Sequence, residues 1–276
     1  MITRLESEQS VKEYLDIMDH RKIEQLIDTL DKVEQNRKEC YIREFSIEHF
    51  HDSKVFETLI PKICKIFREE NEELTGFENE EILAEYQIYK TPGYVYMKGN
   101  VQIYSAGKQA ADISAFPEGI AVAVGSEEDV PDICPDQTID KVFTIENLTS
   151  FYRFKQEHSL VIYLGGYHNR SRRNLLMQIY QKLPDAQYYH FGDLDAGGFY
   201  ILEHLKRKTG IPFQMFQMDI ETLKKYEDYA KPLTENDKKR LMQLEKMELP
   251  DEERKLITYM LQKGIKLEQE CISESQ

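Results

Sequence analysis

The sequence contains no apolar stretch long enough to cross a membrane. Its longest purely apolar stretches, residues 120–124 and 160–164, have the length of buried strands, whereas a membrane-spanning helix needs about 20 apolar residues. The N-terminus, which begins MITRLESE, also lacks the charged-then-apolar profile of a signal peptide. We therefore expect a cytoplasmic protein with no membrane segment.

Cysteine is scarce, and its few positions are not paired. None of the four cysteines belongs to a CxxC motif, and no histidine lies at zinc-ligand spacing from any of them. Extracellular disulfide frameworks and zinc centres both need such clusters. The sequence therefore predicts reduced thiols in a reducing compartment.

Positive charge is in deficit. Lys and Arg number 36 against 50 Asp and Glu, which gives a formal net charge of −14. This charge argues against indiscriminate binding to nucleic acid, because neutralisation of phosphates needs Lys and Arg. A local basic patch remains compatible with it. With 41% hydrophobic residues, the chain can bury an ordinary core and is not of the disordered class.

The N-terminal part of the sequence is mostly helical by pattern. Residues 8–38 carry apolar side chains at helical spacing without Gly or Pro. This predicts one or two amphipathic helices, which serve either as a packing element or as a coiled-coil arm. Residues 53–70 predict a further helix, capped by Asp52-Ser53 and kinked or split at Pro61.

Two strand patterns follow the helices, at residues 94–97 and 101–104. They lie on either side of the turn sequence of residues 98–100 and predict a β-hairpin. Helices followed by a hairpin are compatible with a winged-helix-like module, among other small α+β folds. We expect a helical arm over residues 1–40 and an N-terminal α+β module over residues 41–135.

From residue 120 onward, strand patterns alternate with helical patterns. The expected strands are residues 120–124, 142–145, 160–164, 187–191 and 212–216, and the expected helices are residues 148–156, 171–182 and 198–208. This alternation predicts βαβ units around a parallel sheet, and therefore an α/β fold. Helices punctuated by Pro232 and Pro250 follow, so we expect residues 136–276 to form one domain with C-terminal helices.

Acidic residues follow two of the expected strands. Glu146 comes directly after one strand, and Asp193 and Asp195 follow another. The carboxyl ends of parallel strands meet at one edge of a sheet, where ligands bind. Because Gly192 and Gly197-Gly198 leave room for a phosphate, and because crowded carboxylates repel one another unless a cation lies between them, the pattern predicts a Mg²⁺ site.

The Asp-x-Asp pattern taken alone is not specific. A calcium loop beginning at Asp193 would place His204 where such a loop has Glu, which disfavours that interpretation. Phosphatases with an aspartyl nucleophile carry the motif on the first strand of the core, and here at least two strands precede it. A solvated turn that happens to hold two acids stays open as an alternative.

A basic loop precedes the helix expected at residues 171–182. Arg170, Arg172 and Arg173 lie at its start, together with His168. A helix N-terminus with free N–H groups and nearby guanidinium groups suits a phosphate, so these residues are the candidates for DNA binding. An ordinary solvated basic helix face is the alternative.

Two segments resemble a known family. Residues 143–151 (FTIENLTSF) and residues 191–198 (FGDLDAGG) resemble the Toprim core of type VI topoisomerase A subunits and meiotic break-forming proteins. They also resemble the C-terminal domain of the JetD family, the nuclease subunits of Wadjet anti-plasmid systems. The resemblance extends from about residue 43 to residue 270. One departure is Ala196, where related motifs often have proline, which would change the stiffness of the loop.

The resemblance implies a metal-dependent DNA endonuclease. Glu146, Asp193 and Asp195 would be the catalytic acids and the ligands of Mg²⁺ or Mn²⁺, in a Toprim-like catalytic domain. Glu268 and Glu270 are candidates for further metal ligands, which a solvated end of the C-terminal helix explains equally well. The implied partners are double-stranded DNA, a second copy in a homodimer, and an SMC-like motor complex of the JetABC type.

Two other function classes stay open beside the nuclease. The first is a non-catalytic DNA-binding or scaffold subunit with the same fold, and the second is a phosphotransferase or phosphatase that acts on small substrates. Topoisomerase-like chemistry would need a nucleophilic tyrosine, and none of the 17 tyrosines stands out. Direct hydrolysis with a metal ion is therefore the simpler expectation.

Overall fold

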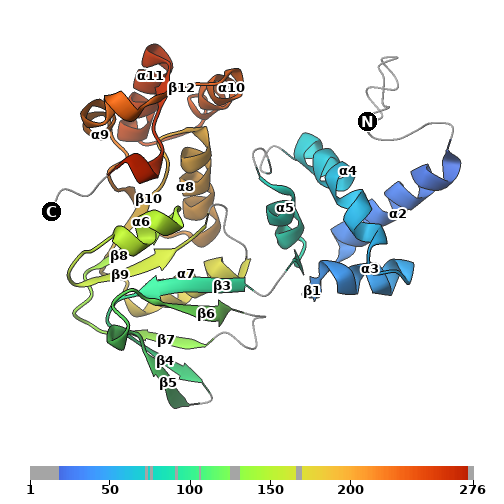
Figure 1. The fold of residues 1–276 in the computed structure, drawn as a ribbon, viewed down its shortest axis with the longest axis horizontal. Coiled ribbons are helices and arrows are strands. Elements are labelled where there is room, and N and C mark those ends of the chain that lie inside the picture. Colours follow the sequence, from blue (N-terminus) through green and yellow to red (C-terminus); the bar gives the residue numbers. More distant parts are fainter. Residues whose placement is uncertain are drawn as a thin grey trace. The chain divides into compact units, whose positions relative to one another are not determined.

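The computed structural model divides the chain by internal contacts into two compact units, residues 1–92 and residues 93–276 (Figure 1). The residues that the structure describes are 19–71, 74, 77–90, 93–105, 107–124, 131–165 and 170–272. The division at residue 92 differs from the boundaries at residues 40 and 135 that we expect from the sequence, and those functional boundaries stay a prediction.

The first unit is helical. Its described elements are α2 (His20–Gln35), α3 (Ile42–Phe50), α4 (Val55–Glu70), α5 (Asn79–Glu85) and two short parallel strands, β1 (Cys40–Tyr41) and β2 (Ile88–Tyr89). Leu26, Thr29 and Val33 form the buried stripe of α2, at the spacing of one helix face. The predicted amphipathic helix is therefore confirmed over His20–Gln35, and the part of it before residue 19 lies outside the described residues.

The prediction that Asp52-Ser53 caps the next long helix is wrong. α4 begins at Val55 with Lys54 at the N-cap position and no side-chain cap. Asp52 instead accepts a hydrogen bond at Oδ1 from the N–H of Lys54, at 2.7 Å, because its carboxylate closes a local turn before the helix starts. Pro61 lies inside α4 without dividing it.

The second unit is built on a six-stranded mixed sheet with the order β11-β10-β8-β9-β3-β6. Its strands are β3 (Gly93–Lys98), β6 (Ile120–Val124), β8 (Lys141–Ile145), β9 (Ser159–Tyr163), β10 (Gln187–Phe191) and β11 (Gln214–Met215). β11, β10, β8 and β9 are parallel, as the alternation of strands and helices predicts. β3 and β6 are antiparallel additions at one side, so the sheet is mixed rather than purely parallel.

Helices connect and cover the parallel strands (Figure 1). They are α6 (Leu148–Arg153), α7 (Arg170–Lys182), α8 (Ala196–Thr209), α9 (Ile220–Lys225), α10 (Glu235–Leu244) and α11 (Asp251–Lys263). The main core joins Phe143 and Phe191 of the sheet to Phe199 of α8, Leu241 of α10 and Ile257 of α11. The C-terminal helices are therefore part of the same hydrophobic core as the sheet, and burying that core stabilises both.

The predicted hairpin at residues 94–104 is wrong, although both strands exist. β3 pairs with β6 and β9, whereas β4 (Val101–Ser105) pairs with β5 (Lys108–Asp112) and β7 (Asp132–Pro135) in a separate three-stranded sheet. Gly99 has a φ of +137°, and a Cβ there would lie 2.5 Å from the carbonyl oxygen of Ser159. The chain thus crosses between two sheets at this glycine, and the strands needed for a winged helix belong to the second unit.

Two expectations from the composition can be compared with this structure. In the described part of the chain, no helix has both the length and the apolar content needed to cross a membrane. The four cysteines are free thiols, and Cys40 and Cys64 are buried.

Candidate active site at the ends of two parallel strands

The carboxyl ends of β8 and β10 lie side by side. Ile145 and Phe191, the last residues of the two strands, are partners in the parallel register. The N–H of Glu146 donates to the carbonyl oxygen of Phe191 at 3.0 Å. In the next turn of chain, the N–H of Asp193 donates to Oε2 of Glu146 at 3.2 Å. The structure thus brings together the acids that follow the two strands.

Glycine is required at two positions around these acids. A Cβ on Gly192 would lie 2.7 Å from Oε2 of Glu146 and 2.8 Å from Nε2 of His190. A Cβ on Gly198 would lie 2.2 Å from the carbonyl oxygen of Asp193. All three distances are shorter than real Cβ contacts, so the glycines allow the carboxylate and the main chain to approach closely.

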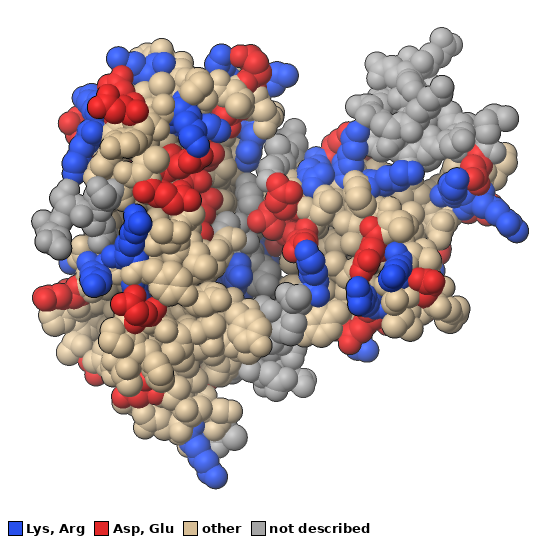
Figure 2. All heavy atoms as spheres, in the orientation of Figure 1, with Lys and Arg blue, Asp and Glu red and all other residues tan. Residues whose placement is uncertain are grey.

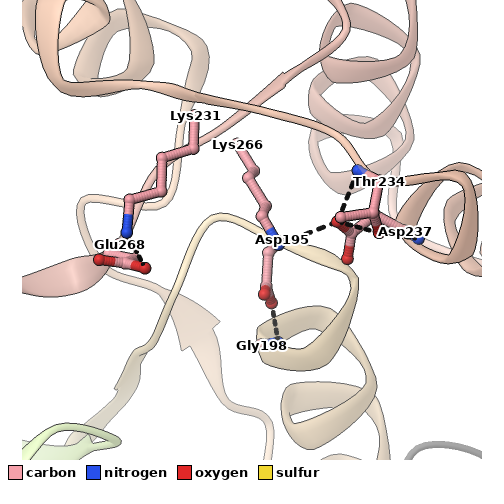
Figure 3. A network of polar contacts seen from close by, with 7 residues as sticks. All are labelled: Asp195, Gly198, Lys231, Thr234, Asp237, Lys266 and Glu268. Carbon is pink, nitrogen blue, oxygen red and sulfur yellow. Dashed lines mark hydrogen bonds and ion pairs between the residues drawn. The ribbon is translucent and has the colours of Figure 1, made fainter.

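Asp195 begins helix α8. It is the N-cap residue, and its Oδ1 accepts a hydrogen bond from the N–H of Gly198 at 2.9 Å (Figure 3). A carboxylate at this position satisfies a free N–H and interacts favourably with the positive end of the helix dipole. The acid therefore has a structural role that does not depend on catalysis, and the cap fixes where its side chain lies.

The carboxylate of Asp193 lies in an unfavourable electrostatic environment. Burial, reinforced by the negative charges of Asp195, Glu270 and Glu268, raises its pKa from 3.8 to about 6. A hydrogen bond from the N–H of Gln269 to Oδ1, at 2.7 Å, opposes this rise. The site is therefore a cluster of carboxylates in which Asp193 ionises less readily than an ordinary aspartate.

The C-terminal segment, residues 267–271, brings two of these acids to the site. The sequence predicts a helix here, and that prediction is wrong: α11 ends at Lys263, and its C-cap Gly264, with a φ of +71°, turns the chain back. β13 (Ile265–Lys266) follows, Leu267 pairs with Leu194 through two main-chain hydrogen bonds, and a 3₁₀ turn covers Gln269–Cys271. The segment therefore runs beside the loop that carries Asp193.

Each glutamate of this segment has a described polar partner. Oε1 of Glu268 lies 2.5 Å from Nζ of Lys231 (Figure 3). Oε1 of Glu270 accepts a hydrogen bond from Nδ2 of Asn147 at 2.5 Å. Asn147 also caps α6 by accepting hydrogen bonds from Thr149 and Ser150, so it connects the end of β8 to the C-terminal segment.

The sequence model of the family described as "Wadjet protein JetD, C-terminal" matches residues 128–276, more than half of the chain. The chain belongs to this family. A Wadjet protein JetD from Bacillus cereus (strain Q1) is 28% identical over 263 residues, which are 94% of this chain and 63% of that protein. The chain therefore spans less than two thirds of that relative's length.

Gln269 is a buried residue beside these acids that the sequence does not single out. Its side chain is buried with 0% exposure, between two exposed glutamates. The sequence offers no signal for it, since a glutamine among acids at the end of a chain has the pattern of a solvated segment. Only the return of the chain to Leu194 places it inside the fold.

The donor set suits a hard cation in chemistry but not yet in arrangement. Among the described residues, no three His, Cys, Asp or Glu side chains lie close enough together to form a ready metal-binding group. Asp193 and Asp195 each use Oδ1 in an internal hydrogen bond. Carboxylate oxygens are the ligands that Mg²⁺ prefers, and the like charges that raise the pKa of Asp193 are those that a cation would neutralise. The donor types therefore suit Mg²⁺, but the described residues do not form a ready three-ligand group.

Two lysines lie across from each other beside the acids. Lys231 of β12 (Lys231–Pro232) and Lys266 of β13 are partners in a two-stranded antiparallel ribbon. Lys231 pairs with Glu268, and Nζ of Lys266 lies 2.9 Å from Oδ2 of Asp237, which also accepts hydrogen bonds from Thr234 (Figure 3). The ribbon therefore carries positive charge to the edge of an otherwise acidic site.

The predicted DNA-binding arginines are only partly described. His168 and the side chain of Arg170 lie outside the described residues. Arg172 donates to the carbonyl oxygens of Leu164 at 2.6 Å and Tyr94 at 3.4 Å, and Arg173 is 9% exposed. On the face of the second unit seen in Figure 2, basic and acidic side chains of the described residues are interspersed. DNA binding by these residues stays a prediction.

Proposed function

We propose that the chain is a Mg²⁺- or Mn²⁺-dependent endonuclease of the Toprim type that hydrolyses DNA phosphodiester bonds. The observation that carries this proposal is the placement of Glu146 and Asp193 at the adjoining carboxyl ends of β8 and β10, in hydrogen-bond contact. Ligand sites of open parallel sheets lie at this edge. Membership of the JetD family supports the same function, since that family resembles Toprim nucleases.

Glu146, Asp193 and Asp195 would hold the metal ion, with Glu268 and Glu270 as further ligands. When bound, such an ion polarises a phosphoryl oxygen and lowers the pKa of an attacking water. The chain's own residues prepare the site. The helix cap orients Asp195, and the missing side chains at positions 192 and 198 let the carboxylate of Glu146 and the carbonyl group of Asp193 pack closely against the main chain.

The partners of the site follow from the same proposal. The relative that resembles this chain carries the name Wadjet protein JetD, so we propose that this chain also serves a Wadjet anti-plasmid system with an SMC-like motor of the JetABC type. Double-stranded DNA would be the substrate, two copies would form a homodimer, and the protein would act in the cytoplasm. The basic residues Arg170, Arg172, Arg173 and His168 would contact DNA phosphates.

A non-catalytic scaffold role is the second candidate. It is favoured by one observation, the lack of a ready three-ligand metal group among the described residues. A phosphatase for small substrates is the other alternative. One cavity in the described part of the chain, of about 400 Å³, lies beside β4 and β7 and is lined by residues such as Asn100, Tyr104 and Gln137, without any of the candidate acids, so this cavity does not support that alternative.

Plasmid cleavage separates these functions. Purified protein, alone and with its Wadjet partner proteins, is incubated with supercoiled plasmid and Mg²⁺ or Mn²⁺. The proposal expects nicked or linear product that disappears when a chelator is added or when Glu146 is replaced by Gln. Binding of plasmid without any cleavage, in every metal and with the partners present, would support the scaffold role instead.

A further inference from the structure

We propose that Gln269 is a positioning residue of this site, which locks the C-terminal segment between the ends of β8 and β10 and thereby fixes the carboxylate of Asp193. This inference rests on the proposed function for its catalytic meaning. The arrangement of hydrogen bonds that supports it can be tested without any activity.

Gln269 takes part in three hydrogen bonds that carry this proposal. Its Oε1 accepts from the N–H of Asn147, at the end of β8, at 2.8 Å. Its Nε2 donates to the carbonyl oxygen of Phe191, at the end of β10, at 2.8 Å. Its main-chain N–H donates to Oδ1 of Asp193 at 2.7 Å. The residue therefore contacts both strand ends and the candidate ligand itself.

The side-chain amide can form this connection in only one orientation. Oε1 faces an N–H and Nε2 faces a carbonyl oxygen. In a flipped amide, the NH₂ group would face the N–H of Asn147 and the amide oxygen would face the carbonyl oxygen of Phe191, so neither hydrogen bond could form. The residue has 0% exposure, and a buried amide without hydrogen-bond partners destabilises the folded state. Glutamine thus supplies one donor and one acceptor at the distance between the two strand ends.

The main chain around Gln269 is held from both sides. Leu267 and Leu194 exchange N–H···O hydrogen bonds of 2.9 and 3.1 Å, which fix the segment before Gln269 beside the loop of Asp193. Glu270, the next residue, accepts from Nδ2 of Asn147. Because the side-chain amide anchors the middle of this short segment, it also determines where the main-chain N–H that serves Asp193 lies.

The consequence for the site is geometric. Glu146 and Asp193 come from different strands, and their relative position depends on how the two strand ends are held together. Gln269 bridges those ends directly, and the same segment carries Glu268 and Glu270 on either side of it. Loss of the amide should therefore loosen several candidate ligands at once while the sheet and the helices remain folded.

The test replaces Gln269 by Met, which has a similar volume and neither a donor nor an acceptor at the amide positions. The matched control is Gln262→Met, at an exposed position of α11. Hydrogen exchange is measured at the main-chain amides of Asn147 and Gln269 in the full chain without metal. We expect exchange to be at least tenfold faster in Gln269→Met and unchanged in Gln262→Met. Equal protection in parent and variant would overturn the inference.

Metal binding provides the second readout. Mn²⁺ affinity is measured by calorimetry on folded protein, and we expect Gln269→Met to weaken it at least tenfold relative to parent and control. A variant with a lower melting temperature but the affinity of the parent would show a merely structural residue and reject the positioning role. If the parent itself binds no Mn²⁺ and cuts no DNA, the proposed function fails, and hydrogen exchange alone decides the inference.

A third variant covers the case in which Gln269→Met does not fold. Gln269→Glu keeps an acceptor for the N–H of Asn147 but loses the donor to Phe191. We expect Asn147 to stay protected in this variant while Mn²⁺ affinity changes, since the link to β10 is broken and a charge is added. Unchanged affinity together with unchanged exchange at Gln269 would again overturn the inference.

Discussion

The main-chain N–H of Asp193 donates a hydrogen bond to Oε2 of Glu146, so each of these acids helps to place the other. This contact exists because β8 and β10 end in register and because Gly192, between β10 and Asp193, carries no side chain. Substitutions at and around this contact should therefore have separable effects on stability, metal binding and cleavage.

Replacing Gly192 by Ala should disturb this contact directly. The new Cβ would lie 2.7 Å from Oε2 of Glu146 and 2.8 Å from Nε2 of His190, so at least one of the two side chains must move. Overpacking of this kind costs about 1–3 kcal/mol. Urea unfolding should show that loss, and cleavage should fall further than the loss of stability explains. A variant with normal stability and normal cleavage would mean that the close approach has no role.

Two substitutions of Asp195 should separate its role as a helix cap from its proposed role as a metal ligand. Asn is as good an N-cap as Asp, whereas Ala costs about 0.5–2 kcal/mol at such a position. We therefore expect Asp195→Asn to keep the melting temperature of the parent and Asp195→Ala to lower it, while both lose metal-dependent cleavage. If Asp195→Asn cuts plasmid at the parental rate, the residue is a helix cap and not a ligand.

Asp193→Asn should stabilise the metal-free protein. The pKa of Asp193 is raised from 3.8 to about 6, chiefly by burial, so its ionised form costs free energy that grows as pH rises from about 4 to 6 and is complete above 6. Because one pKa unit corresponds to about 1.4 kcal/mol, the gain at pH 7 is at most about 3 kcal/mol.

The same substitution should reverse the effect of metal. Millimolar Mn²⁺ should raise the melting temperature of the parent, because a ligand that binds only the folded state stabilises it, and it should leave Asp193→Asn unchanged. Thermal unfolding at pH 7, with and without Mn²⁺, measures both effects. Equal shifts in the two proteins would indicate a general effect of ions on the surface.

His190 should make the second unit sensitive to acid. Burial lowers the pKa of this histidine from 6.5 to about 3, and its Nδ1 lies 2.9 Å from Oγ1 of Thr144. Below pH 6.5 this histidine takes up a proton in the unfolded chain, whereas it stays neutral in the folded protein. The free energy of unfolding therefore falls by about 1.4 kcal/mol per pH unit between about pH 6 and 4. Urea unfolding at pH 7 and pH 5 should show a smaller difference in His190→Gln than in the parent. The exposed His158 is the control, and an equally small difference in His158→Asn would assign the effect elsewhere.

The local pattern of the sequence predicts most of the second unit. Strands of β-branched and aromatic residues alternate with helices between residues 141 and 216, and the structure has them within a few residues of the expected bounds. Glu146 and Asp193 follow two such strands, so their proximity needs only the pairing of β8 with β10. Local propensity and the handedness of βαβ units suffice for that much.

Interactions between residues far apart in the sequence determine the parts of the fold and of the site that the local pattern does not predict. β3 and β4 have the sequence of a hairpin, but each finds a better partner in another part of the chain, and Gly99 lets the chain cross between the two sheets. Gln269 contacts residues 76 and 122 positions away. No periodicity or spacing in the sequence encodes contacts of that length, because they depend on the tertiary fold.

The return of the chain at Gly264 sets the order in which the site can form during synthesis. The ribosome completes β8, β10 and Asp193 76 residues before it adds Gln269. At about 5–20 residues per second, that interval lasts roughly 4–15 s. Throughout it, the nascent chain contains the acid-bearing strands but cannot supply the N–H of Gln269 that donates to Asp193. An unfinished chain therefore carries the acids of the site without the hydrogen bonds of Gln269 that connect the two strand ends. A chain that stops before Gln269 would never form these bonds.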